Sequence, residues 1–155
     1  QMEHLFGKIL NNEMILNEYG KIVEEEILRT LQIRENIYID NYVIMPNHIH
    51  FIIEIVKNDI KKQIENGNTP NNEGVRKTEF YSIKKLKSTS KNIGSIIRAI
   101  KAGATARINE IRNSFCNPVW QRNYYENIIR NEKAYLKVME YIKDNPLKWD
   151  EDRYR

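Results

Sequence analysis

Two histidines separated by a single residue are the first feature of the sequence with the potential for chemistry. His48 and His50 lie in a run of alternating polar and apolar residues, so a β-strand would send both imidazoles to the same face. Imidazole is a common ligand of divalent metal ions, and two histidines leave most of the coordination sphere open to a substrate. The pattern predicts half of a catalytic metal site. The alternative is a pair of histidines that only form hydrogen bonds at a sheet surface.

A tyrosine and an asparagine four residues apart form the second candidate feature. Tyr141 and Asn145 fall in a stretch with helical periodicity, so they are neighbours on one face of the predicted helix. Tyr141 lies at the border of the apolar stripe, beside charged positions, where a tyrosine can line a cleft. The alternative is an amphipathic tyrosine that buries its ring and keeps its hydroxyl in water. That alternative applies equally to Tyr124, Tyr125 and Tyr135.

Basic residues are concentrated in one part of the chain. Segment 76–113 contains ten Lys and Arg against two Glu, and therefore carries +8 while the whole chain carries +4. Such clustering is typical of proteins that bind a phosphate backbone, and it favours nucleic acid as a partner over a merely solvated basic loop. The candidates for contact with the backbone are Lys84, Lys85, Lys87, Arg98 and Lys101.

Hydrophobic periodicity predicts the elements that position these residues. Helices are expected at 12–31, 93–112 and from Asn131 to just before Pro146, because apolar side chains recur there at helical spacing. The second helix would pack on a sheet and show its basic residues to solvent.

Three segments are predicted to be strands. Segments 37–45 and 48–56 read as an antiparallel pair around a tight turn, and 119–129 suits a further strand. Segment 58–91 is polar and offers little to bury, which is typical of a long mobile loop.

The order of these elements indicates the fold class. Helix, strand, strand, helix, strand, helix resembles an α+β, ferredoxin-like βαββαβ fold, with an antiparallel sheet and its helices on one face. The first strand would be missing, or would lie in segment 5–9. A length of 155 residues suits one domain, taken as 1–149, with a charged tail at 150–155.

Composition narrows the class of protein. The chain is 41% hydrophobic and 30% charged, which is typical of a globular protein, and no apolar run is long enough to cross a membrane. The lone Cys116 excludes an internal disulfide framework. We expect a soluble, cytoplasmic protein with no membrane partner.

Taken together, the motifs resemble those of a known family. In chain order they read PNHIHF at 46–51, VWQRNYYE at 119–126, IRNE at 129–132 and YIKDNP at 141–146. This ordered set is similar to that of the REP-associated tyrosine transposases, which belong to the HUH single-tyrosine transposases. The resemblance extends over nearly the whole chain, and the ordered set is far more specific than any one of its motifs.

The resemblance implies a site and a reaction. It assigns His48 and His50 as ligands of Mg²⁺ or Mn²⁺, Asn145 as an amide that can complete the metal site, and Tyr141 as the nucleophile. The reaction it implies is single-strand DNA nicking through a 5′-phosphotyrosine intermediate, followed by transfer of the strand. The second candidate nucleophile is Tyr125.

The resemblance also implies the partner. Single-stranded or hairpin DNA would be bound by the basic groove, with Arg122 and Tyr124 as further contacts and with exposed aromatic rings stacking on bases. Trp120 is at least as well suited to the core. The REP-associated branch favours a monomer in which the tyrosine acts in its own chain, although a dimer is possible.

The chain departs from the family pattern at two places. Family members usually have a strand ahead of the segment that matches 3–7, and many carry His at the position of Asn127.

Two other functions remain open. A noncatalytic module that binds hairpin DNA or RNA would use the same basic helix without a metal, and would form no covalent adduct. A metal-dependent phosphodiesterase that uses water would release product without trapping the protein.

Overall fold

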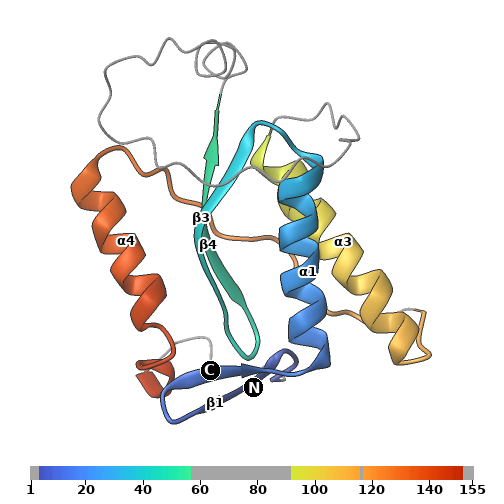
Figure 1. Cartoon of the computed structure of the whole chain (residues 1–155). Helices are drawn as coiled ribbons and strands as arrows, with labels where there is room; N and C mark the ends of the chain where they lie inside the picture. The colour runs from blue at the N-terminus through green and yellow to red at the C-terminus, as the bar shows by residue number, and fades with distance from the viewer. Residues whose placement is uncertain (1–3, 57–91, 116, 152–155) are drawn as a thin grey trace.

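The computed structural model describes residues 4–56, 92–115 and 117–151, in which two antiparallel strand pairs and three α-helices make up the fold (Figure 1). In chain order the elements are β1 (Gly7–Leu10), β2 (Glu13–Leu16), α1 (Glu18–Ile33), β3 (Ile37–Ile44), β4 (Ile49–Ile55), α3 (Ile93–Ile111), α4 (Glu132–Asp144) and the short 3-10 helix η1 (Trp149–Glu151). The class is α+β as expected, and the arrangement is compatible with a ferredoxin-like fold, although the strand order is defined only within two separate strand pairs. The predicted loop at 58–91 lies outside the described residues, as does most of the charged tail.

Helices α1 and α3 pack against each other and supply most of the core. Each begins at an asparagine cap: the backbone N–H of Gly20 donates to Asn17 at 3.0 Å, and that of Ser95 donates to Asn92 at 2.8 Å. The stripes predicted from periodicity are the buried ones, and their core members are Ile22, Val23, Ile27, Ile96, Ile100, Ala104 and Ile108.

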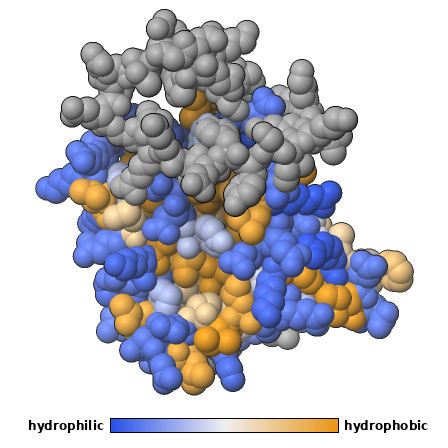
Figure 2. All heavy atoms as spheres, viewed as in Figure 1, coloured by the Kyte–Doolittle hydropathy of each residue, from blue (hydrophilic) through white to orange (hydrophobic). Residues whose placement is uncertain are grey.

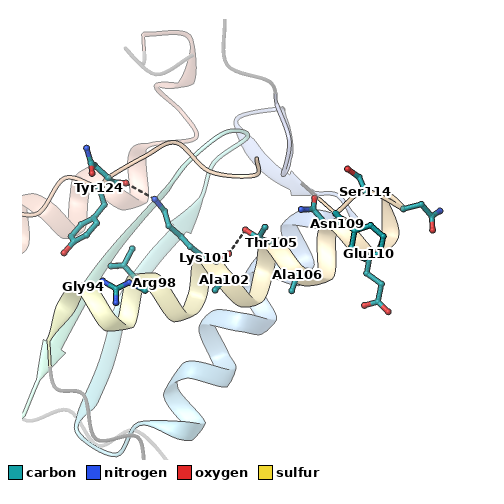
Figure 3. Close-up of a pocket in the computed structure, with 14 residues that line it drawn as sticks. Gly94, Arg98, Lys101, Ala102, Thr105, Ala106, Asn109, Glu110, Ser114 and Tyr124 are labelled. Carbon is teal, nitrogen blue, oxygen red and sulfur yellow. Dashed lines mark hydrogen bonds between the residues drawn. The ribbon is translucent and has the colours of Figure 1, made fainter. Parts of the chain in front are cut away.

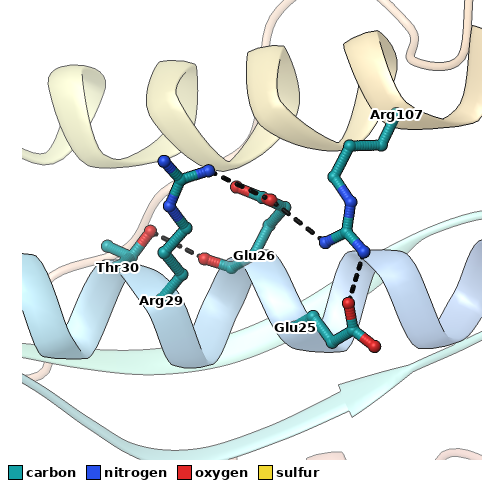
Figure 4. A network of polar contacts seen from close by, with 5 residues as sticks. All are labelled: Glu25, Glu26, Arg29, Thr30 and Arg107. Carbon is teal, nitrogen blue, oxygen red and sulfur yellow. Dashed lines mark hydrogen bonds and ion pairs between the residues drawn. The ribbon is translucent and has the colours of Figure 1, made fainter. Parts of the chain in front are cut away.

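A polar network crosses the contact between α1 and α3 (Figure 4). The Glu26 side chain on α1 is buried, and its carboxylate lies 3.2 Å from the Arg107 guanidinium of α3 and 3.5 Å from that of Arg29. Gly103 of α3 leaves room for this carboxylate, because a Cβ there would lie 2.2 Å from Glu26 Oε2. The buried charge is therefore paired, and the close approach depends on a glycine.

The predicted hairpin at 37–56 is confirmed. Strands β3 and β4 pair antiparallel from Ile37↔Ile55 to Ile44↔Ile49, and the Met45 N–H donates to the His48 carbonyl at 2.8 Å to close the turn. The turn is anchored to the N-terminal segment. Pro46 is fully buried, and its carbonyl accepts a hydrogen bond from the Phe6 N–H at 2.9 Å. The histidine motif therefore starts from a fixed, buried point.

The helices occupy both faces of this strand pair. Side chains of β4 alternate: Ile49 and Ile53 pack against the core under α1, while His50 contacts Tyr141 of α4. Figure 1 shows α4 on the opposite side of β3 and β4 from α1 and α3. The expected placement of helices on one face therefore holds for α1 and α3 only.

The sequence predicted that a helix begins at residue 12, whereas α1 begins at Glu18. Instead, β1 and β2 form a hairpin, and its turn residues Asn11 and Asn12 have φ of 51° and 64°. Asparagine tolerates this left-handed conformation, which suits a two-residue hairpin turn. The strand in segment 5–9 thus exists, but it pairs with β2 and not with β3 or β4.

The predicted strand at 119–129 is not formed. The segment runs as irregular chain along α3 toward α4, and the strand pairing within the described residues contains no partner for it. A β-branched and aromatic composition gives a strand only when a neighbouring edge can take its hydrogen bonds.

Hydrophobic side chains reach the surface in the middle of the face shown in Figure 2, between α4 and α1. On that face the described helices cover the strands only in part. None of the helices that the structure describes is long and apolar enough to cross a membrane.

Candidate metal and tyrosine site

The tight turn between β3 and β4 orients the first histidine. The Asn47 side-chain oxygen lies 2.7 Å from His48 Nδ1, and because an amide oxygen is only an acceptor, the Nδ1–H group donates the hydrogen bond. His48 Nε2 is then left with its lone pair. A histidine whose second nitrogen donates to a fixed acceptor is set up as a metal ligand through the other nitrogen.

The two imidazoles converge through their Nε2 atoms. His48 Nε2 and His50 Nε2 are 3.0 Å apart, and the ring planes lie at 80°. Two ligands at right angles, each about 2.1 Å from one ion, are separated by about 3.0 Å. The pair therefore has the spacing of adjacent ligands of one octahedral ion. The same spacing also suits a direct N–H···N hydrogen bond between the rings.

Tyr141 meets this pair from helix α4. Its ring lies edge-on to His50, with centroids 5.2 Å apart and planes at 78°. The residue is 48% exposed, so part of it is accessible from solvent. Residues separated by 91 positions in the sequence are thus brought together within one chain.

Asn145 lies one turn beyond Tyr141 and ends α4. The residue is 4% exposed, and its side-chain Nδ2 is buried without a hydrogen-bond partner. The amide nitrogen and oxygen are interchangeable by a rotation of the side chain, which would place an oxygen at this unsatisfied position. A buried polar atom without a partner is unusual, and an oxygen ligand for a cation would account for it.

The donor set therefore fits a small divalent ion. Among residues 4–56, 92–115 and 117–151, no group of three or more His, Cys, Asp or Glu side chains is placed to hold a metal. Of the three ligands that the sequence predicted, His48 and His50 lie together, and Asn145 follows one turn after the tyrosine that contacts His50. Mg²⁺ and Mn²⁺ accept such ligands and keep further positions for water and phosphate oxygens.

Trp149 is a member of this site that the sequence reasoning did not identify. It is 6% exposed, stacks on His48 at 6.2 Å and 29°, and meets the exposed His4 edge-on at 5.4 Å. Its position, four residues after Asn145, was the available signal. Trp149 shields one side of His48 from solvent.

The other candidate nucleophiles lie elsewhere. Tyr124 points its hydroxyl toward the start of α3, where a Cβ on Gly94 would lie 3.3 Å from it. Helix α3 lies on the face away from the histidines. Tyr125 is 83% exposed on the segment that leads to α4. The ring in contact with His50 belongs to Tyr141.

Comparison with known proteins identifies a relative. A protein of Haemophilus influenzae (strain Rd KW20), described only as an uncharacterized protein, is 43% identical over 151 residues. The aligned part spans 97% of this chain and 77% of that protein. The chain belongs to the same family. No family model matches the chain, and no solved structure matches it.

The residues of this chain that the sequence predicted to contact DNA lie in different places. Lys84, Lys85 and Lys87 lie outside the described residues. Arg98, Lys101 and Tyr124 line one open groove of about 1200 Å³ along α3 (Figure 3), while Arg122 is exposed on the adjacent segment.

Lys101 is tied to the main chain. Its ammonium donates to the carbonyls of Gln121 at 3.0 Å and Asn123 at 2.8 Å, and burial lowers its pKa. The Trp120 indole N–H in turn donates to the Lys101 carbonyl at 3.0 Å, and Trp120 packs against the core. Lys101 therefore holds segment 120–123 against α3. Of the three N–H groups of its ammonium, one remains to donate to a phosphate.

Proposed function

We propose that the chain is a metal-dependent single-strand DNA nickase and strand transferase that attacks the phosphodiester with Tyr141. The observation that carries the proposal is the contact of the two histidines with each other and of His50 with Tyr141. His48 and His50 offer imidazole nitrogens, Asn145 offers a buried amide without a partner for its Nδ2, and the half-exposed Tyr141 contacts the ring of His50. The ordered motifs that resemble those of the HUH tyrosine transposases agree with this assignment.

The metal ligands and Tyr141 have different roles in the proposed reaction. Mg²⁺ or Mn²⁺ held by His48, His50 and Asn145 would supply Lewis-acid chemistry toward a phosphate oxygen. Tyr141 Oη forms a bond to phosphorus and loses its proton, while the bond from phosphorus to the 3′-oxygen breaks and that oxygen leaves as a hydroxyl. The product is a 5′-phosphotyrosine. A 3′-hydroxyl from a second strand can reverse the step and rejoin DNA without an external energy source.

The partner and the oligomeric state are further parts of the proposal, and each rests on a different observation. Tyr141 contacts His50 of its own chain, which favours a monomer acting in cis. The groove along α3, with Arg98 at its edge, suits a phosphate backbone. Hairpin DNA that presents a single strand is the expected substrate, and a cytoplasmic location is part of the proposal.

A covalent adduct tests the proposal. The protein is incubated with Mn²⁺ and labelled hairpin DNA from beside its own gene, and products are separated on a denaturing gel. We expect a protein–DNA adduct with the wild type and with Tyr125→Phe, and none with Tyr141→Phe. An adduct that disappears only with Tyr125→Phe would move the nucleophile, and cleavage by Tyr141→Phe without any adduct would indicate a phosphodiesterase that uses water.

A noncatalytic hairpin-binding module is the second candidate, and one observation favours it. The 3.0 Å separation of His48 Nε2 and His50 Nε2 also fits a hydrogen bond that needs no metal. Binding that is unchanged by a chelator, with no cleavage for any ion or candidate hairpin, would support this module against the nickase.

A further inference from the structure

A single extra residue in strand β3 aims a carboxylate at the helix that carries Tyr141. The register of β3 and β4 shifts between Ile39, which faces Ile53, and Asn41, which faces Ile52. Asp40 is the residue between them, and it has no place in the ladder. Such a bulge bends the strand and redirects a side chain.

The faces to which the side chains of β3 point show the effect of the bulge. Ile39 and Tyr42 both pack against the core cluster on the α1 side, although they are three residues apart. In a regular strand, residues an odd number apart point to opposite faces, so counting from Ile39 sends Asp40 away from the core, whereas counting from Tyr42 would send it toward the core. The extra residue allows Ile39 and Tyr42 to share a face, so that Asp40 turns to the α4 side.

On the α4 side, Asp40 has a partner. The Tyr135 hydroxyl, in the second turn of α4, donates a hydrogen bond to Asp40 Oδ2. Tyr135 precedes Tyr141 by six residues, which is about 9 Å along a helix. A hydroxyl bound to a carboxylate is among the stronger hydrogen bonds in proteins.

Besides this hydrogen bond, α4 is held by the half-buried Ala134, Val138 and Met139 and by the packing of its C-terminal end. Ile142 is its one buried residue, and the neighbouring buried groups, Asn145 and Trp149, follow at the same end. The C-terminal end is therefore held by packing, and the bond from Tyr135 to Asp40 ties the N-terminal half. Attachment at both ends restricts rotation of the helix about its axis, although less apolar surface holds α4 than holds α3.

We propose that Asp40 and Tyr135 are positioning residues that dock α4 on the strand pair and thereby set the approach of Tyr141 to His50. The significance of this docking for nicking rests on the proposed function, whereas the docking itself does not. Neither residue touches the metal ligands in this assignment, and their effect reaches the reaction through the helix.

The test compares substitutions that remove the bond with one that keeps it. Tyr135→Phe removes the donor and Asp40→Ala removes the acceptor, whereas Asp40→Asn keeps an acceptor oxygen. Tyr42→Phe is the matched control, because Tyr42 donates to the Glu24 carboxylate at 3.0 Å from the same strand but on the core side. Circular dichroism establishes that each variant is folded.

Two readouts separate docking from chemistry. Proton NMR measures the nuclear Overhauser effect between the rings of His50 and Tyr141, which does not depend on any reaction. Nicking assays with Mn²⁺ and hairpin DNA measure kcat and KM. We expect Tyr135→Phe and Asp40→Ala to weaken the Overhauser effect and to lower kcat by about 10- to 100-fold with KM little changed, because a misplaced nucleophile affects the chemical step. Asp40→Asn and Tyr42→Phe should retain both, and the double variant Asp40→Ala/Tyr135→Phe should be no worse than either single variant.

The outcomes distinguish this inference from the proposed function. An Overhauser effect that persists in Tyr135→Phe and Asp40→Ala would overturn the docking role, even if kcat falls. Its disappearance in both variants supports docking, and it does so even if the wild type never nicks DNA, in which case only the proposed function fails. Strongly additive effects in the double variant would also count against a single shared bond.

Discussion

Replacing Gly103 by alanine should lower the free energy of unfolding, because the added methyl group would displace the Glu26 carboxylate. A Cβ at this position would lie 2.2 Å from Glu26 Oε2 and 2.7 Å from Glu26 Cδ, so the Glu26 side chain must move. Moving it breaks its pairing with Arg107 and Arg29 while the charge remains largely buried. Breaking a buried pair costs about 3–5 kcal/mol, and we take about 3 kcal/mol because the two arginine side chains are 40% and 62% exposed.

The substitution also brings a gain. Alanine is favoured over glycine inside a helix by about 1 kcal/mol, so Gly103→Ala should lower the free energy of unfolding by about 2 kcal/mol. For a chain of this length that is a fall in Tm of about 4–8 °C. In a Glu26→Ala background the clash is absent, and the same change should stabilise by about 1 kcal/mol.

Urea unfolding of the four proteins in this cycle measures the coupling between the two positions. Gly94→Ala in the same helix is the control, because the nearest atom to its new Cβ is the movable Tyr124 hydroxyl at 3.3 Å. An equal loss of stability for Gly103→Ala in both backgrounds would refute the role of Glu26.

Three further predictions concern the other elements. Gly7→Ala should destabilise the protein by about 2 kcal/mol or more, as read from urea unfolding, since Gly7 has φ of 147° and a Cβ would lie 2.2 Å from the Ile15 carbonyl oxygen; no loss of stability would contradict this. Burial, followed by the hydrogen bond to Glu24, raises the pKa of Tyr42 to about 12, above the unfolded value of about 10. The stability from this shift is fully present below about pH 10 and is lost as the pH rises toward about 12, so thermal melts of Tyr42→Phe should show a shallower alkaline decline than the wild type. Mn²⁺ at about 100 times its Kd should raise the Tm of the wild type by about 5–11 °C, equivalent to about 2.7 kcal/mol, and should leave His50→Ala unchanged; an equal rise in both would place the ion elsewhere.

Much of the scaffold was predictable from local pattern. The stripes of α1 and α3 and the hairpin of β3 and β4 follow from side-chain period alone, because one face of each element is buried against the same core. The alternation of His48 and His50 placed both rings on one face, and the structure has their Nε2 atoms 3.0 Å apart. Four-residue spacing likewise put Tyr141 and Asn145 on one face of α4.

What could not be predicted depends on partners that are distant in sequence. The segment 119–129 has the composition of a strand, but composition does not supply the neighbouring edge that a strand needs. The bulge at Asp40 cannot be read from β3 alone, because it arises from packing Ile39 and Tyr42 together against the core. The early start expected for α1 overlooked that Asn11 and Asn12 suit a tight turn.

The two halves of the candidate site differ in how firmly they are held, which leads to a last prediction. The histidine hairpin is anchored by the fully buried Met45 and Pro46, whereas α4 has one buried residue where α3 has six. The proposed strand transfer would require fixed metal ligands and a tyrosine that can meet a second strand, and a lightly held α4 would suit that requirement. In hydrogen–deuterium exchange, α4 amides should exchange faster than those of α3, because local opening is easiest where little apolar surface is buried. Saturating Mn²⁺ should slow exchange at the Asn145 end of α4 more than at its Glu132 end. Equal protection of α3 and α4 without metal would mean that the tyrosine helix is as fixed as the core, and the second strand would then have to come to Tyr141.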